Sequence, residues 1–382
     1  MPIWLNNLGL SFESCFKHTK DLTHNSEAIS CLQKAVHLTH EGHANMPSRL
    51  NNLGKSFQSR FQYTGDLTDN SMALSKYHQS ATCISGSPSQ RLDSAIQWAK
   101  LSAPQSLDAY STAIQLISQV AGLEHTIQKR HASLTSISDL AASAATCAFK
   151  LGRPDLALEW LEQGRCLVWT QLNNLQTPLD ALYAYNPVLA RDMLRVSRAL
   201  YNAGSRSSLS LDVATMEQKM SMQDEEISHA KLAQEWNQLL TDIRAIPEFE
   251  DFLRPPSCSN LFKHLPNSGC IIVINVDQHS SGCDALALVS GSNAPLHIAL
   301  PNFSYAKAAD LHKQLDTHLH AANLLMRGCE LDIRALCKVT EHTDGDVIKN
   351  ILCQLWSLVV KPILDGLGYS VSTLSILAKL KS

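Results

Sequence analysis

The feature of this sequence that most constrains its fold is an internal repeat with a period of 45 residues. Leu5-Asn6-Asn7-Leu8-Gly9 recurs as Leu50-Asn51-Asn52-Leu53-Gly54, and the two copies stay in register without a gap as far as Ala28 and Ala73. A fixed period is typical of folds that stack one supersecondary unit on the next. We therefore predict two equivalent structural units within residues 1–90.

Each copy has the apolar spacing of two helices. The first copy has apolar residues at the spacing of one face of an α-helix, namely Leu5, Leu8, Phe12 and Phe16. The second copy has apolar residues at the same spacing. In each copy a proline precedes these apolar residues, at a position in the first helical turn where proline is tolerated. A second helix follows the turn, with Thr23 or Thr68 as the expected N-cap. Two antiparallel helices per copy predict a helical solenoid.

The later part of the chain divides by pattern. Helical periodicity persists through residues 91–200 as degenerate repeats, and residues 201–262 are predicted to be a helical connector. The β-branched run Cys270–Val276 predicts a strand buried on both faces. Further strands at residues 284–289 and 297–300 predict a meander, with helices at 305–326 and 346–367 after it. Residues 263–382 are thus expected to form a separate α/β domain.

The repeat resembles the tetratricopeptide repeat (TPR) of the kinesin-light-chain type, through its L-x2-L-G-x2-F stripe followed by alanine-bearing helices. The usual period is shorter, so the extra residues are placed in a longer first helix and the turn. The resemblance implies a concave groove that binds a protein or peptide partner. Its lining positions map to Asn6, Leu10, Glu13, Asn51, Lys55 and Gln58. The alternative is that the asparagines bridge neighbouring repeats.

The remaining chain resembles the caspase-like CHAT domain and the degenerate repeats joined to it, a combination abundant in fungal proteomes. The matching residues include Leu161-Glu162-Gln163-Gly164-Arg165 and Leu355-Trp356 with Pro362-Ile363-Leu364. In that family, a catalytic His in a His-Gly pair and a catalytic Cys after Ser-Ala follow this point. Neither motif occurs in the sequence. The resemblance therefore implies a chain truncated before its catalytic motifs.

Two other candidate sites are weaker. Cys270 or Cys283 with His279 or His297 would be a possible thiol and imidazole pair, although their spacing does not show that they approach. His312, Asp316 and His320 share one predicted helix face, where a transition-metal site and a solvated polar face are the alternatives. We expect the polar face, and we expect no metal or cofactor.

Charge and composition exclude several classes. The net charge of −3 provides no basic surface for nucleic acid or for a membrane. No uninterrupted apolar run approaches the ~20 residues of a membrane span, and Met1-Pro2-Ile3-Trp4 does not begin a secretory signal. The eleven cysteines contain no C-x-x-C pair. A cytoplasmic location is expected.

Together these patterns predict an α+β multidomain protein, with a mainly α-helical TPR-like solenoid followed by an incomplete α/β caspase-like (CHAT) domain. The predicted function is a protein-interaction scaffold that is catalytically inactive as given. The alternative is a caspase-like cysteine endopeptidase in a full-length form.

Overall fold

The computed structural model describes residues 1–102, 106–120, 139–164, 173–204, 216–321 and 345–369. The chain divides into two compact units. Residues 1–140 and 162–255 form one unit, and residues 141–161 and 256–382 form the other. The structure is mostly helical and has a three-stranded antiparallel sheet, which confirms the α+β class.

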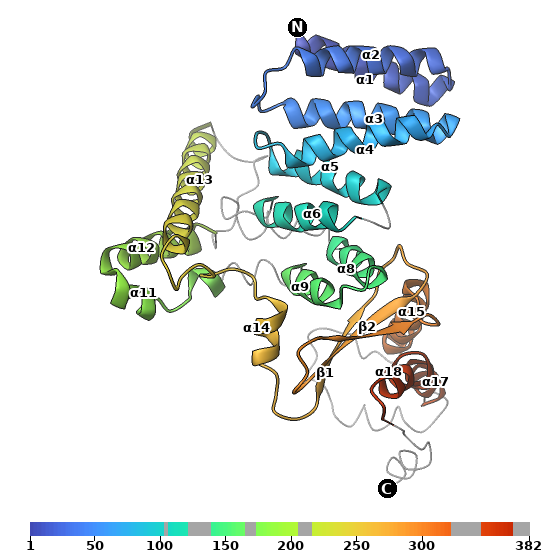
Figure 1. Cartoon of the computed structure of the whole chain (residues 1–382), viewed down its shortest axis with the longest axis vertical. Coiled ribbons are helices and arrows are strands. Elements are labelled where there is room, and N and C mark those ends of the chain that lie inside the picture. Colours follow the sequence, from blue (N-terminus) through green and yellow to red (C-terminus); the bar gives the residue numbers. More distant parts are fainter. Residues whose placement is uncertain (103–105, 121–138, 165–172, 205–215, 322–344, 370–382) are drawn as a thin grey trace. The chain divides into compact units, whose positions relative to one another are not determined.

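The two sequence copies form two helix pairs. The first copy contains α1 (Pro2–Thr19) and α2 (Leu22–His37), and the second contains α3 (Met46–Thr64) and α4 (Leu67–Thr82). A third pair, α5 (Pro88–Leu101) and α6 (Leu107–Val120), follows, and each pair packs on the next (Figure 1). The prediction of two helices per copy is confirmed.

The second helix of each copy begins earlier than predicted. Its N-cap is Asp21 in one copy and Asp66 in the other, and each carboxylate accepts the N–H of the threonine two residues later at 2.9 Å. The prediction of Thr23 and Thr68 as caps was therefore wrong. A carboxylate at a helix N-terminus also meets the positive end of the helix dipole. The hydrogen bond from the Thr23 N–H lowers the pKa of Asp21.

The turns between the paired helices allow the energetic cost of a left-handed backbone conformation to be measured. Lys20 and Gly65 occupy equivalent positions, and both are left-handed, with φ of 59° and 77°. A side chain in this conformation costs about 1 kcal/mol. We therefore expect Lys20→Gly to raise the free energy of unfolding by about 1 kcal/mol, less a small entropic offset from the unfolded chain. Urea unfolding followed by far-UV circular dichroism measures this change.

The reverse substitution is the control. Gly65→Lys should lower the free energy of unfolding by a similar amount, because nothing lies close to Gly65 and only its backbone conformation opposes a side chain. If both substitutions shift the urea midpoint in the same direction, the explanation by backbone conformation is wrong.

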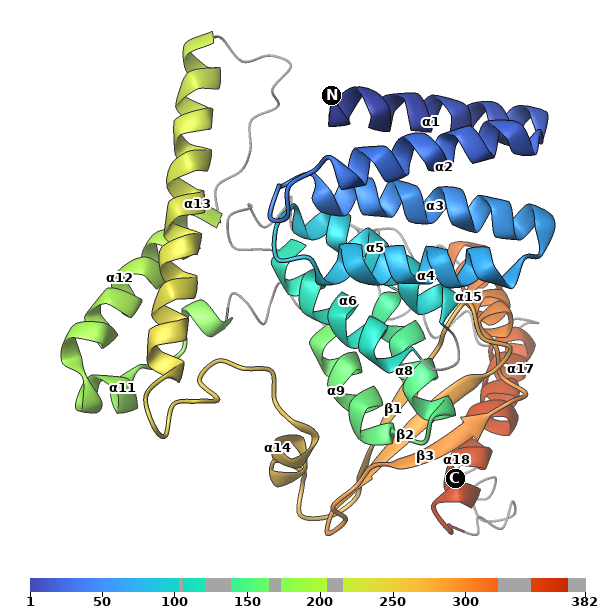
Figure 2. The ribbon, with the colours of Figure 1, turned by 45° about the horizontal axis from the view of Figure 1, so that its top comes forward.

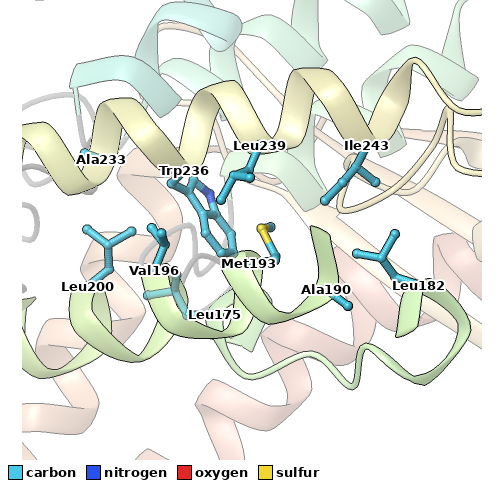
Figure 3. Packing of buried hydrophobic residues seen from close by; sticks show 10 residues of the cluster. All are labelled: Leu175, Leu182, Ala190, Met193, Val196, Leu200, Ala233, Trp236, Leu239 and Ile243. Carbon is cyan, nitrogen blue, oxygen red and sulfur yellow. The ribbon is translucent and has the colours of Figure 1, made fainter. Parts of the chain in front are cut away.

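A second helical cluster occupies the later part of the first unit. It consists of α11 (Asp180–Tyr185), α12 (Pro187–Gly204) and α13 (Met216–Arg244). Trp236 of α13 and Met193 of α12 point toward one another in its core (Figure 3). The predicted connector at 201–262 thus contains a helix that packs on α12 around a buried apolar cluster.

The sheet is a meander in the order β1-β2-β3, with β1 at Cys270–Asn275, β2 at Cys283–Val289 and β3 at Leu296–Leu300. Both neighbouring pairs are antiparallel, which confirms the predicted meander. The prediction that the first strand is buried on both faces was wrong. Among the strands that the structure describes, β1 lies at an edge, and Ile271 and Ile274 remain 44% and 45% exposed.

Helices cover both faces of this sheet (Figure 2). Cys283, Ala285 and Leu300 face a cluster formed with α15 (Tyr305–Ala321), α17 (Gly345–Leu355) and α18 (Lys361–Gly366). The other face meets α8 (Leu140–Lys150), which is followed by α9 (Pro154–Gly164). A short helix, α14 (Cys258–Lys263), precedes the sheet.

Helix α8 belongs to the sheet because buried polar groups attach it there. The Asn275 side chain is 2% exposed, and its Nδ2 donates to the Ala142 carbonyl at 3.1 Å and to Thr146 Oγ1 at 2.9 Å. Ser143 Oγ donates to Asp277 Oδ1 at 3.0 Å. Residues 141–161 therefore group with the sheet and not with the repeats of predicted segment 91–200. The predicted helical residues Leu134, Ile137 and 165–172 lie outside the described residues.

The last described helices form a nearly continuous rod. A π-helical turn, η1 (Trp356–Val360), joins α17 to α18 just before Pro362. Residues Val347–Gly366 have a mean hydropathy of 1.4 and are, by length and composition, long and apolar enough to cross a membrane. These residues meet the criterion for a membrane span through their mean hydropathy, although they contain no uninterrupted apolar run of that length. Ile351, Val359 and Ile363 are each 5% exposed, within the cluster against the sheet, whereas Ile348 and Leu352 are 40% and 60% exposed.

Candidate functional site

Two of the three residues predicted to line a groove in the first copy, Asn6 and Glu13, make contacts between repeats. Asn6 Oδ1 accepts a hydrogen bond from Asn52 Nδ2 of α3 at 3.1 Å. Glu13 is 5% exposed, and its carboxylate accepts from Asn25 Nδ2 at 3.1 Å and from Ser59 Oγ at 2.6 Å. Both side chains thus join the first helix pair to the second, which agrees with the bridging alternative.

The predicted groove residues of the second copy differ in their exposure to solvent. Asn51 is 6% exposed within α3, and Gln58 Oε1 accepts the Tyr77 hydroxyl at 2.6 Å. Burial raises the pKa of Tyr77, so this hydroxyl stays protonated and donates at neutral pH. Of the predicted groove residues in the second copy, only Lys55 is exposed, so its ammonium group is accessible to a ligand.

Sequence reasoning missed the residue at the centre of this network. Asn25 is fully buried, and its Nδ2 donates to Ser56 O at 3.1 Å as well as to Glu13. The available signal was the recurrence of this asparagine as Asn70 at the repeat period. A buried polar side chain needs partners, so a repeated asparagine on an otherwise apolar helix face indicates a contact between units.

Two of the predicted groove positions, together with two further residues, form an open surface on the first two helix pairs. Leu10 of α1 and Lys55 of α3 are repeat equivalents, and both are exposed. Lys17 and Gln62 are a second exposed equivalent pair one to two turns further along the same helices. We call these four residues the A-helix surface. It combines an aliphatic group, two ammonium groups and an amide, which suits a peptide with apolar and acidic residues.

The sheet unit contains an aspartate and histidine pair. His297 Nε2 lies 2.7 Å from Asp284 Oδ1, and the imidazole stacks on Phe149 with ring centroids 4.5 Å apart. Such a pair orients an imidazole. Because Phe149 belongs to α8, the same contact also holds this helix on the sheet.

The predicted thiol partner of His297 is elsewhere. The paired residues of β2 and β3 place Cys283 on the face of α15 and α17, opposite to His297. Burial raises the pKa of the Cys283 thiol to about 11, so it is protonated and unreactive at neutral pH. The structure does not bring Cys283 and His297 together.

No family model matches this chain, and no curated protein matches it significantly.

The predicted histidine cluster on α15 does not converge on a metal site. Asp316 and His320 approach within 3.7 Å on the exposed helix surface. Among the residues that the structure describes, no group of three or more His, Cys, Asp or Glu side chains is arranged to hold a metal ion. The A-helix surface remains the best candidate for a functional site.

Proposed function

We propose that this chain is a protein-interaction scaffold of the tetratricopeptide-repeat and CHAT type, in which the helix pairs of residues 1–120 bind a protein partner. One observation supports the proposal above the others. Glu13, Asn25 and Asn52 make hydrogen bonds within the chain between the first two pairs, although the buried atoms Asn25 Oδ1, Asn51 Oδ1 and Ser56 Oγ have no hydrogen-bond partner. The equivalent outward positions Leu10 and Lys55 stay exposed.

The ligand is an extended or helical peptide segment that pairs an apolar side chain with a carboxylate. Leu10 offers 41% of its surface for apolar contact. Lys55 of α3 offers an ammonium group, and so does Lys17 of α1, whose Nζ also lies 3.9 Å from Glu13 Oε1. A partner that crosses both helices meets these groups in turn, and the charge pair contributes to orientation and association rate.

The test is selection of peptides on the full chain, followed by fluorescence polarisation with the selected peptides. We expect Lys55→Glu to weaken binding by about tenfold or more, because it removes a cation and repels the ligand's carboxylate. The matched control is Lys34→Glu, which makes the same charge change at an exposed position of α2. The proposal fails if no peptide is selected, or if the two variants weaken binding equally.

We do not extend the proposal to peptide hydrolysis. The CHAT resemblance implies a cysteine endopeptidase, but Cys283, which is buried, and His297 lie on opposite faces of the sheet.

A further inference from the structure

Helix α12 buries one face against α13. Met193, Val196 and Leu200 of α12 are at most 1% exposed, and Figure 3 shows them pointing toward α13. They stand three or four residues apart, which is the spacing of one side of an α-helix. Each residue turns the helix by about 100°, so a residue two positions earlier lies on the opposite side.

Arg191, Leu194 and Arg198 occupy these opposite positions. Each stands two residues before one of the three buried residues, and we call them the α12 stripe. All three are exposed, and Leu194 offers 40% of its surface. The two arginines are about 10 Å apart along the helix axis. The α12 stripe therefore presents two guanidinium groups with an exposed leucine between them.

The arginines of the α12 stripe keep their positive charge. The other arginine of α12, Arg195, forms an ion pair with Glu235 of α13. Within the part of the chain that the structure describes, neither Arg191 nor Arg198 forms an ion pair, and Arg191 Nε donates to a backbone carbonyl one turn earlier at 3.1 Å. Asp192, the one acidic residue of α12, adds to the negative charge near Arg195. The two guanidinium groups of the stripe are therefore available to the carboxylates of a ligand.

We propose that the α12 stripe binds an acidic amphipathic helix of a partner protein. Two carboxylates about two turns apart on that helix match Arg191 and Arg198, and an apolar side chain between them packs on Leu194. A guanidinium binds a carboxylate through two parallel hydrogen bonds, which fixes the geometry of the contact. Charge complementarity commits the stripe to this ligand, because a purely apolar helix would bury two arginines without a counter-charge.

A protein partner fits the α12 stripe better than a polyanion does. Segments that bind anionic membranes carry about four to eight clustered cations, and binding to nucleic acid neutralises several phosphates at once. The stripe has two cations with a leucine between them. It lies on α12, whereas the A-helix surface lies on α1 and α3, so this inference goes beyond the proposed function and does not depend on it.

The test is a displayed library of helical peptides, selected on the full chain and depleted on the double variant Arg191→Glu with Arg198→Glu. The remaining peptides should carry two carboxylates two turns apart with an apolar residue between them. In fluorescence polarisation with these peptides, Arg198→Glu should weaken binding by about tenfold or more. The matched control, Arg254→Glu, makes the same charge change at another exposed arginine of the same unit and should alter binding by less than about twofold.

Milder variants keep the test independent of folding. Arg198→Gln and Leu194→Ala should each weaken binding by about threefold or more with unchanged circular dichroism. The proposal is overturned if depletion leaves no peptide, if the remaining peptides lack carboxylates, or if Arg254→Glu weakens binding as much as Arg198→Glu. Binding of phosphatidylserine vesicles or single-stranded RNA that Arg198→Glu abolishes, with no peptide selected, assigns the stripe to a polyanion instead. Lys55→Glu should leave peptide binding unchanged, and a loss would assign these peptides to the A-helix surface.

Discussion

Gly54→Leu is expected to unfold the second helix pair. A Cβ atom at Gly54 would lie 2.9 Å from Tyr77 Cε1 and 3.0 Å from Tyr77 Cδ1. The tyrosine cannot move aside, because it is fully buried and its hydroxyl donates to Gln58 at 2.6 Å. Overpacking a rigid site costs about 3 kcal/mol or more. Urea unfolding followed by far-UV circular dichroism should show an early loss of helix.

Two further variants complete this experiment. Gly54→Ala adds the Cβ atom alone, and should lower the free energy of unfolding by about 1 kcal/mol, because the clash outweighs the better helix propensity of alanine. Lys55→Leu adds a leucine at the next, exposed position and should change stability by less than about 0.5 kcal/mol. A Gly54→Leu variant as stable as Lys55→Leu would disprove close packing of α3 on α4.

Asn25→Ala should detach the first helix pair from the second. It leaves the buried Glu13 carboxylate without its Asn25 donor and Ser56 O without its side-chain partner. The loss of buried hydrogen bonds, one of them to a carboxylate, costs about 3 kcal/mol. Hydrogen exchange should show that α1 and α2 amides open more readily while those of α12 and α13 stay protected.

The internal repeat supplies the control for this prediction. Asn70 is the equivalent residue of the second copy, and it is only half buried, whereas Asn25 is fully buried; the Oδ1 atom makes no hydrogen bond in either residue. Asn70→Ala should cost less than about 1 kcal/mol. Glu13→Gln should also be tolerated, because an amide oxygen still accepts and the second copy has Gln58 at this position. Equal losses in Asn25→Ala and Asn70→Ala would contradict the role of the Glu13 network.

The helices of the repeats could be predicted from the sequence because apolar residues recur in them every three or four positions. Pro2 and Pro47 mark the first turns, as predicted. The caps were misplaced because Asp21 and Thr23 are both good capping residues, and the choice depends on which residue remains extended outside the helix. The sequence pattern does not distinguish such neighbours.

The candidate site was less predictable. Asn6 and Lys55 both come from the same family-based mapping, yet Asn6 bonds to the next repeat while Lys55 stays in solvent. The difference depends on Asn52 and Ser59, which are about one repeat away in sequence from Asn6 and Glu13. A side chain's partner at this separation is set by how the pairs stack, and not by its neighbours in the chain.

The repeat, its helix pairs and the three strands with their order as a meander could be predicted from the sequence alone, because these features depend on contacts within a few residues or across short turns. Three features depend on packing between distant segments: β1 is at the edge of the described strands, α8 covers the sheet, and Leu8 is exposed where its counterpart Leu53 is buried. Burial of an apolar side chain depends on whether a distant segment covers it. The same repeat position is therefore core in α3 and surface in α1.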